Sequence, residues 1–370
     1  MLVIEGQRRF VLGLYDLPKL PDGWEQARSA GFNLVHTRPS AEDIGLARRH
    51  GMHTWVSVGS ISAVKRSADQ ARIRAIVEKF RNDPALLFWE TEDEPSFVWK
   101  KREARISPEQ IIETHAFVKS LDPAHPLYLN HAPVNLESTL QRYNAGAEII
   151  ATDIYPVIPH GIREQYALWP DGQQGDLSDT TIGQVGRYTD KMRRVAGPSR
   201  AVFMVLQAFA WEDLRKENKD PKMVLYPDRG QIRFMAYQSI IHGANGILFW
   251  GLPFVPSGAP LWADLRSVAR EIRDLLPALA QPAAQLTLGI EYRDTGHSLD
   301  RGIEWSARPI EGGLLLLCVN ADRNPVEATI TIPARFRRCQ IAAGGADVPV
   351  SRGAIAQAFA PFEARALRLS

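Results

Sequence analysis

Four acidic residues stand together between residues 90 and 94, where the apolar run Pro84–Trp89 ends in Glu-Thr-Glu-Asp-Glu and Pro95 follows. Burying carboxylates at the end of a hydrophobic strand costs desolvation free energy unless they face a cleft. In parallel α/β proteins that cleft lies at the carboxyl ends of the strands. A solvated acidic turn is the structural alternative, because Asp and Glu are mostly surface residues. Glu94 is therefore a candidate general acid if neighbouring elements place it in such a cleft.

Polar and aromatic side chains also stand at the ends of the other predicted strands. Asp153 and Tyr155 are two residues apart, so they lie on the same face of one strand. If these acids, amides, phenol and indole groups meet at the carboxyl ends of the strands, they would form a site suited to a sugar. Sugar hydroxyls bind polar side chains, and the apolar faces of the sugar ring stack on Trp. Each residue also has a structural alternative, such as a turn cap, a buried ion pair or core packing. The candidate substrate-binding residues are Arg38, Asp93, His131, Tyr155, Gln207, Trp211 and Trp250.

The elements that would position these residues alternate between strand and helix from about residue 10 to about residue 280. The helical segments carry end signals, such as Ser107-Pro108 before one helix and Gly31 after another. Eight strand–helix units over this length predict a (β/α)8 TIM barrel. A doubly wound sheet is the alternative, but no glycine-rich phosphate loop follows the first strand. The predicted strands are Phe10–Tyr15, Phe32–Thr37, His53–Val58, Leu86–Trp89, Pro126–Leu129, Ile149–Ile154, Ala201–Ala208 and Gly246–Trp250.

The pattern changes after residue 280, where β-rich segments alternate with turn residues and no helical period remains. This change predicts a catalytic barrel over residues 1–280 and a small all-β sandwich over residues 281–370. Two long loops, from Ile158 to about Ile182 and from Trp211 to about Pro227, follow strands six and seven of the barrel. Loops of this length are usually functional, so both are expected at the catalytic mouth.

Composition excludes several other classes of function. Lys and Arg number 44 against 42 Asp and Glu, and a net charge of +2 gives no field that would select nucleic acid or an anionic membrane. The spacing of Cys and His predicts no metal site, and no organic cofactor is implied. Cys318 and Cys339 could form a disulfide or remain thiols. No apolar signal-peptide segment and no membrane-spanning stretch is present, so a soluble protein is expected, either cytoplasmic or trimmed of a leader.

The strand-end residues resemble those of the TIM-barrel glycoside hydrolases of clan A. Those enzymes carry an Asn-Glu-Pro-like motif after strand four, whose Glu is the acid/base, and here the counterpart is Asp93-Glu94-Pro95. The resemblance covers nearly the whole chain, including a lead-in hairpin at residues 6–15 and a C-terminal sandwich. It implies that the fold is a barrel and that the substrate is a carbohydrate. The family's binding positions after strands two, five, six and eight would correspond to Arg38, His131, Tyr155 and Trp250.

The chain departs from this family after strand seven, where the nucleophilic Glu is replaced by Gln207. The enzyme could invert, with Glu94 as acid and Asp153 as base, because carboxylates on separate strands suit the separation of about 6.5–9.5 Å of an inverting pair. Alternatively, Glu212 could reach back as a nucleophile. A third explanation is that the Glu is absent, because the protein does not hydrolyse its ligand or because the residue was mutated.

The residues together predict a glycoside hydrolase acting on an oligo- or polysaccharide, with inversion by Glu94 and Asp153 as the favoured mechanism. One alternative is a carbohydrate-binding protein on a degenerate glycosidase barrel, which Gln207 would explain. Another is a transglycosylase or a retaining enzyme that uses Glu212 or the substrate itself as nucleophile.

Overall fold

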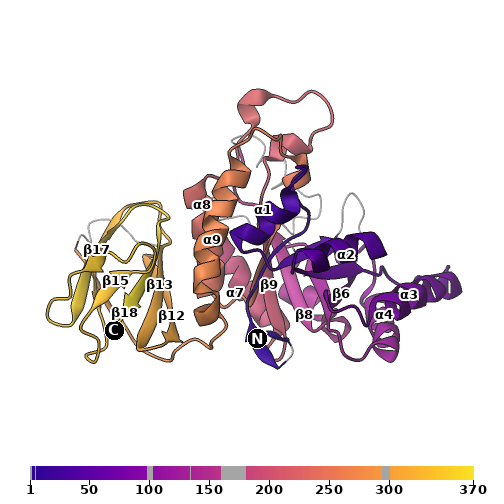
Figure 1. The fold of residues 1–370 in the computed structure, drawn as a ribbon, viewed down its shortest axis with the longest axis horizontal. Helices are drawn as coiled ribbons and strands as arrows, with labels where there is room; N and C mark the ends of the chain where they lie inside the picture. The colour runs from indigo at the N-terminus through magenta and orange to yellow at the C-terminus, as the bar shows by residue number, and fades with distance from the viewer. Residues whose placement is uncertain (1, 5, 98–102, 134, 160–180, 294–300) are drawn as a thin grey trace.

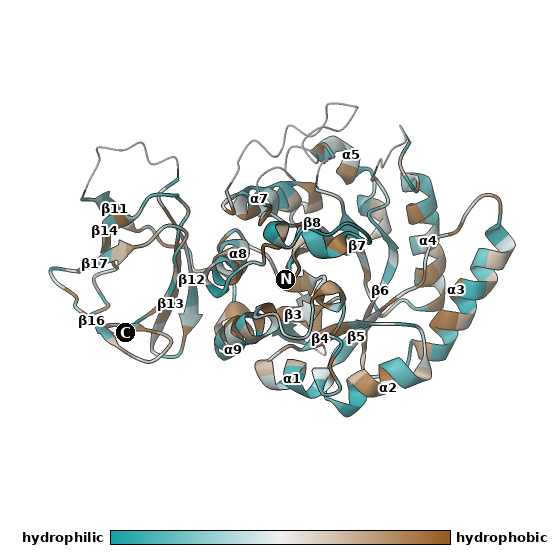
Figure 2. Ribbon diagram, turned by 90° about the horizontal axis from the view of Figure 1, so that it is seen from above, coloured by the Kyte–Doolittle hydropathy of each residue, from teal (hydrophilic) through white to brown (hydrophobic). Residues whose placement is uncertain are grey.

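The computed structural model describes residues 2–4, 6–97, 103–133, 135–159, 181–293 and 301–370. Eight parallel strands close into a barrel in the order β10-β3-β4-β5-β6-β7-β8-β9, which confirms the predicted (β/α)8 fold (Figure 2). All the predicted strands form, but β6 continues past the predicted end at Trp89. The barrel strands are β3 (Val11–Leu14), β4 (Leu34–Thr37), β5 (His53–Ser57), β6 (Leu86–Asp93), β7 (Leu127–His131), β8 (Ile149–Ile154), β9 (Ala201–Gln207) and β10 (Gly246–Trp250).

A helix follows each barrel strand, and the helices surround the barrel (Figure 2). The end signals in the sequence act as expected. Ser107 caps α4 in a reciprocal capping box with Gln110, and Gly31 ends α1 at a left-handed φ of 104°. The helices are α1 (Gly23–Ala30), α2 (Ala41–Arg49), α3 (Arg66–Phe80), α4 (Pro108–Leu121), α5 (Glu137–Gln141), α7 (Gln184–Ala196), α8 (Arg229–Ile241) and α9 (Leu261–Leu279).

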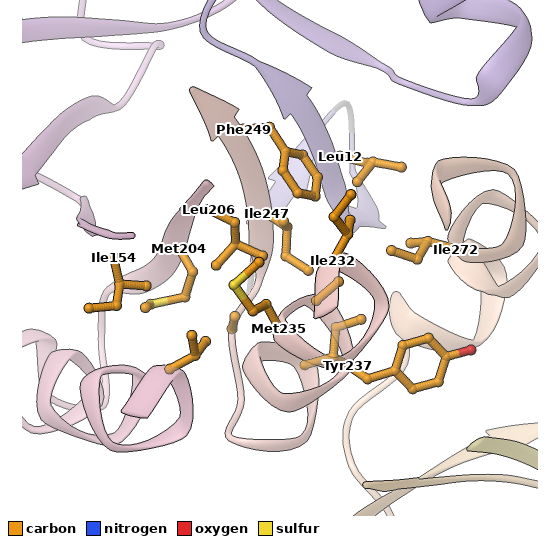
Figure 3. Close-up of a cluster of buried hydrophobic side chains, with 14 of the residues drawn as sticks. Leu12, Ile154, Met204, Leu206, Ile232, Met235, Tyr237, Ile247, Phe249 and Ile272 are labelled. Carbon is orange, nitrogen blue, oxygen red and sulfur yellow. The ribbon is translucent and has the colours of Figure 1, made fainter. Parts of the chain in front are cut away.

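Alternate residues of each barrel strand face opposite sides, because side chains in a strand have a period of two. Inward residues such as Phe88, Tyr128 and Phe203 form one core inside the barrel. Outward residues such as Met204 and Ile247 belong to a second core, shared with the surrounding helices. Figure 3 shows this second core, with Leu12, Met204, Leu206, Ile247 and Phe249 lying close to Ile232, Met235 and Ile272. The same alternation decides which residues at the strand ends reach the mouth of the barrel.

The C-terminal strands form two antiparallel sheets, ordered β11-β14-β17 and β12-β13-β18-β15-β16, which confirms the predicted sandwich. The predicted boundary at residue 281 falls between the end of α9 at Leu279 and the start of β11 at Gly289. The strands of the sandwich are β11 (Gly289–Tyr292), β12 (Ile303–Ile310), β13 (Gly313–Asn320), β14 (Val326–Thr331), β15 (Cys339–Ile341), β16 (Asp347–Val348), β17 (Ala354–Phe359) and β18 (Ala364–Leu369).

Two further strands, β1 (Leu2–Ile4) and β2 (Gln7–Arg9), pair in an antiparallel hairpin that precedes the barrel in the chain.

Strand β13 explains how the sandwich attaches to the barrel. Leu314 and Leu316 face the core between the two sheets, whereas Leu315 and Leu317 join the core shared with the barrel helices. The uninterrupted leucine run is therefore buried on both faces. Helices α8 and α9 lie between the barrel and the sandwich (Figure 1). The barrel helices and the C-terminal sandwich therefore share one continuous hydrophobic core.

An ion-pair cluster around His242 also joins the two parts. The Nδ1 of His242 lies 2.9 Å from Asp190 on α7, and its Nε2 lies 3.0 Å from Glu304 on β12. Burial alone would lower the pKa of His242, but the hydrogen bonds to the two carboxylates raise it to about 9. His242 is therefore charged at neutral pH and stabilises the contact of α7 and α8 with the sandwich.

This cluster predicts a loss of stability at alkaline pH. The folded pKa of about 9 exceeds the unfolded value near 6.5, so the stabilisation is complete below about pH 6.5 and disappears as pH rises through 9. We expect the free energy of unfolding to fall by on the order of 2 kcal/mol across that window in urea titrations. The His242→Gln variant should lack this pH-dependent component. An equal alkaline loss in that variant would contradict the assignment.

Three other predictions can be compared with the structure. Cys318 and Cys339 are buried free thiols, on strands that β18 separates. Residues 160–180 of the first long loop lie outside the described residues, whereas the second contains the short helices η3 (Trp211–Leu214) and η4 (Pro221–Met223). Within the described ranges, no helix has both the length and the apolar character needed to span a bilayer.

Candidate active site

The acidic end of β6 is shaped by a bulge. Glu90 pairs with Tyr128 of β7, but the next pair is Asp93 with Asn130, so β6 holds one residue more than its partner. Such bulges redirect side chains and are frequent beside active sites. The carboxylate of Asp93 consequently reaches Asn130, whereas Glu92 turns to the neighbouring loop and accepts hydrogen bonds from Ser60.

Glu94 has an unusual backbone conformation for a residue with a side chain. Its φ is 46°, in the left-handed region, and its N–H donates to the carbonyl of Asn130 at 3.0 Å. A left-handed non-glycine residue costs on the order of 1–3 kcal/mol and is found more often where function requires it. The backbone geometry thus supports a functional role for Glu94, independently of the chemistry of its carboxyl group.

Glu94 and Asp153 form a carboxyl pair at the mouth of the barrel. Their side chains are joined by a hydrogen bond, although they come from the ends of β6 and β8. Burial, followed by the negative charge of Asp153, raises the pKa of Glu94 well above its usual value. Burial, followed by the charge of Asp93, raises the pKa of Asp153 to about 7. Because the shared hydrogen bond raises the pKa of Glu94 and lowers that of Asp153, the shared proton resides on Glu94.

This contact differs from the separation expected from the sequence. An inverting pair leaves about 6.5–9.5 Å for a water molecule, and a retaining pair stands about 5–5.5 Å apart. A direct hydrogen bond between Glu94 and Asp153 leaves less room than an inverting pair needs for its water molecule. Asn130 of β7, the strand between them, donates its side-chain amide to Asp93 at 3.0 Å and to Asp153 at 3.2 Å.

An aromatic wall, made of Tyr155, Phe209, Trp211 and Trp250, stands beside the carboxyl pair. Tyr155 stacks on Trp250 with ring centroids 5.5 Å apart, and its ring meets Phe209 and Trp211 edge-on. Tyr155, Trp211 and Trp250 are only partly buried. The charges of Asp153 and Glu94 contribute, after burial, to the raised pKa of Tyr155, so its phenol lies near both carboxyl groups. The wall can therefore hold an apolar ring face against a polar centre.

A deeper acidic residue, Glu90, was not singled out by sequence reasoning. Its Oε2 accepts hydrogen bonds from Ser57 Oγ at 2.6 Å and from Trp55 Nε1 at 3.1 Å, while Oε1 is buried without a partner. Burial and the charge of Asp93 raise its pKa to about 7. The available signal was the strand alternation, since Glu90 is two residues after the inward-facing Phe88.

Two of the predicted binding residues lie away from this site. The Arg38 side chain is 79% exposed and pairs with Asp43 of α2 at 2.6 Å. His131 is fully buried outside the barrel against Tyr143, with ring centroids 5.7 Å apart, and burial lowers its pKa to about 3. The prediction for His131 is wrong because strand alternation turns its neighbour Asn130 inward instead. The Arg38 side chain pairs with Asp43 and extends into solvent, so its role in binding stays a prediction.

Gln207 and Glu212 also have other partners. The Gln207 amide is fully buried, accepts from Val157 N at 2.9 Å, and donates to the carbonyls of Val157 at 2.9 Å and Phe209 at 3.0 Å. Both amide hydrogens are used in these bonds, so the backbone of Val157 and Phe209 holds the side chain. Glu212 is buried and accepts a hydrogen bond from Asp220 N at 2.6 Å within its own loop. The structure therefore does not bring Glu212 to the pair.

Replacing Gln207 with Glu should destabilise the protein and should not create a nucleophile. The carboxylate would face two carbonyl oxygens that now accept its hydrogens, so we expect the free energy of unfolding to fall by about 2–4 kcal/mol in urea titrations. The matched control is Gln7→Glu, at an exposed position of β2, which should stay near wild type. Wild-type stability together with increased activity in the Gln207 variant would show that this side chain can face a substrate.

No protein-family model and no curated protein sequence matches the chain. Among solved structures, the GH42 beta-galactosidase Gan42B from G. stearothermophilus matches with a TM-score of 0.59 at 9% identity, over 97% of this chain and 98% of that protein. The alpha-amylase from Geobacillus thermoleovorans matches with a TM-score of 0.58 at 8% identity, over 98% of each chain. The beta-galactosidase from Marinomonas ef1 gives a TM-score of 0.49 at 11% identity, over 72% of this chain, which spans 60% of that protein. At these identities the first two matches show the fold alone, which is a barrel followed by a β-sandwich.

Proposed function

We propose that the chain is a glycoside hydrolase that cleaves an oligo- or polysaccharide at the mouth of its barrel. The observation that carries this proposal is the partly buried, hydrogen-bonded pair of Glu94 and Asp153. Glycoside cleavage requires a carboxylic acid that stays protonated at neutral pH and a second carboxylate that stays charged beside it. The pair can supply both once the pH exceeds the Asp153 pKa of about 7, because burial and the charge of Asp153 retain the proton on Glu94.

Each residue of the mouth has a defined role in this reaction. Glu94 would protonate the glycosidic oxygen, and Asp153 would face the positive charge that develops on the sugar ring in the transition state. The aromatic wall would hold the ring through stacking on Trp250, with Trp211 and Tyr155 at its side. Asp93 is exposed at the rim and is available to accept a hydrogen bond from a sugar hydroxyl.

Inversion with Asp153 as the base, which the sequence favoured, needs room for a water molecule between the pair and the sugar. In the described geometry the carboxyl groups touch, so inversion would require Asn130 to release Asp153 when the substrate binds. The hydrolytic function does not depend on this choice. The stereochemistry of the product does depend on it, and NMR of the first product distinguishes inversion from retention.

The test of the function is a search for products over a panel of oligosaccharides and aryl glycosides, using the Glu94→Gln variant as the blank. Release of a reducing end by the wild type alone supports hydrolysis. A carbohydrate-binding protein on a degenerate barrel is the second candidate, favoured by the structural use of Gln207 at the usual nucleophile position. Calorimetry that detects oligosaccharide binding, without product after prolonged incubation, would replace the enzyme with that candidate.

A further inference from the structure

We propose that His36 is a further substrate-binding residue, whose Nδ1 accepts a hydrogen bond from a sugar hydroxyl, and that Ser57 and Glu90 are positioning residues that hold its ring. The proposal rests on the proposed glycoside hydrolase function and adds a contact across the mouth from Asp153. It follows from a chain of hydrogen bonds that runs from His36 on β4 through Ser57 on β5 to Glu90 on β6.

His36 faces the mouth of the barrel. Leu34 belongs to the core inside the barrel, and His36 is two residues later on β4, so strand alternation turns it inward as well. Its ring centroid lies 6.3 Å from that of Tyr15 and 5.1 Å from that of Trp55, two other members of or neighbours to this core. The side chain is nevertheless 26% exposed. Because His36 stands near the carboxyl end of β4, the exposed part opens to the mouth.

Strand β4 stands across the barrel from the strand that carries Asp153. In the closed order of the barrel, β8 is the fourth strand from β4 in either direction, so the two face each other (Figure 2). The chain from His36 also reaches the acidic end of β6, since the charge of Asp93 contributes, after burial, to the raised pKa of Glu90. A sugar at the mouth would therefore have Asp153 on one side and His36 on the other.

The hydrogen bonds of this chain fix which nitrogen of His36 carries the hydrogen. Above its pKa of about 7, Glu90 is a carboxylate without a hydrogen, so Ser57 Oγ donates its only hydrogen to Glu90 Oε2 at 2.6 Å. The Nε2 of His36, 3.1 Å from the same Oγ, must then donate the second bond. Burial lowers the pKa of His36 to about 4, so the ring is neutral and its Nδ1 keeps a lone pair. Among the described residues, no group forms a hydrogen bond with this Nδ1.

The order of the three residues argues against a nucleophilic serine. In a Ser-His-acid triad the histidine stands between the other two and takes the hydrogen of the serine. Here Ser57 stands in the middle and gives its hydrogen to Glu90, so His36 does not activate it. The arrangement instead holds an imidazole ring with an acceptor atom available at the mouth.

Glu90 is costly for the fold, which supports a functional use of the chain. The residue is only 3% exposed, and its Oε1 is buried without a partner, while Ser57 and Trp55 donate to Oε2. Burying a carboxylate with one oxygen unpaired costs free energy, and such groups are concentrated at functional sites. In this chain the carboxylate commits the hydrogen of Ser57 and thereby keeps Nδ1 of His36 an acceptor. A sugar hydroxyl supplies the donor that this atom lacks.

The experiment begins with two near-isosteric substitutions of His36. In His36→Gln the amide nitrogen can replace Nε2 and donate to Ser57, but no acceptor stands in the place of Nδ1. In His36→Asn an amide oxygen can replace Nδ1, and the bond to Ser57 is lost. On the aryl glycoside that wild type cleaves fastest, at pH 8, we expect kcat/KM to fall by about 10–100-fold in His36→Gln and by less in His36→Asn. The control His50→Gln, at the end of α2 where the ring stacks on Trp24, should keep the wild-type value.

A series of substrates that each lack one hydroxyl then identifies the contact. For each monodeoxy form of that aryl glycoside, the loss of kcat/KM caused by the missing hydroxyl is measured in wild type and in His36→Gln. We expect one position at which the loss is about 10–100-fold in wild type and absent in His36→Gln. Ser57→Ala should reduce the loss at the same position only, because the ring is then less well oriented. A general defect of folding would instead lower the rates on all substrates alike.

The outcomes separate this proposal from the proposed function. Wild-type kcat/KM in His36→Gln, or losses that are the same in both proteins at every hydroxyl position, would overturn the contact and leave a glycoside hydrolase. If no glycoside of the panel is cleaved, the hydrolase function fails, and calorimetric binding of monodeoxy methyl glycosides to wild type and His36→Gln decides the contact by the same comparison. Binding of no sugar at all would remove both.

Discussion

Replacing Glu94 with Gln should lower kcat/KM for a natural glycoside by about 10³–10⁴-fold, because the leaving oxygen would lose its proton donor. The amide has nearly the same shape and can still bond to Asp153, so folding should be unaffected. The loss should be smaller for aryl glycosides whose leaving group needs little protonation. Initial rates on both substrate types, with circular dichroism and thermal unfolding of each variant, measure these effects.

The matched control for this variant is Glu92→Gln, two residues earlier on β6. Glu92 accepts hydrogen bonds from Ser60 N and Oγ, and an amide oxygen can accept both of them. We expect this variant to retain wild-type rates on every substrate. Full activity of Glu94→Gln on natural glycosides would remove Glu94 from the chemistry, and an equal loss in both variants would point to a structural effect of the β6 end.

The second large effect is expected for Asp153→Asn, with a loss of about 10²–10⁴-fold in kcat/KM. The charge that faces the developing cation disappears, while Asn130 can still bond to the new side chain. The pH profile gives a more specific readout. The Asp153 charge raises the pKa of Glu94, so removing it should lower that pKa and move the alkaline limb of kcat/KM to lower pH by about one unit or more.

Asp93→Asn provides a graded comparison, since Asp93 also raises the pKa of Glu94 but ranks below Asp153 as a cause. We expect its alkaline limb to move in the same direction by a smaller amount. Measurements of kcat/KM from pH 4 to 10 on one substrate show which of the two variants moves the alkaline limb further. An unchanged limb in Asp153→Asn, or a larger shift in Asp93→Asn, would contradict the electrostatic coupling of Glu94 to Asp153.

The sequence was informative about the fold because periodicity and end signals are local. Alternation of apolar segments with helical patterns predicted the barrel strands, and Ser107 and Gly31 marked helix ends where the structure has them. The leucine run of β13 predicted a strand, but its burial on both faces depends on the packing of α8 and α9 against it. That contact joins residues far apart in the chain, so no local pattern could reveal it.

The site was harder to predict from the sequence, because strand register decides whether a side chain points into the barrel or away from it. One extra residue in β6 directs Asp93 to Asn130 and Glu92 away, and no residue type at this position signals the bulge. Asn130 and His131 were both at a strand end, and only the alternation of β7 places Asn130 inside and His131 against Tyr143. Glu90 differs from these residues, because its spacing of two from Phe88 already indicated an inward side chain.

What the sequence determined by itself is the set of available groups, with Glu94 and Asp153 after buried strands, aromatic residues after later strands and Gln207 at the end of strand seven. The tertiary structure decided which of these groups meet. The hydrogen bond between Glu94 and Asp153 joins ends of strands that are not neighbours in the barrel, and Asn130 on the strand between them donates to Asp153. The physical reason is that the chemistry of a carboxyl group is set by its distance to other charges and by burial, and both arise only when the barrel closes.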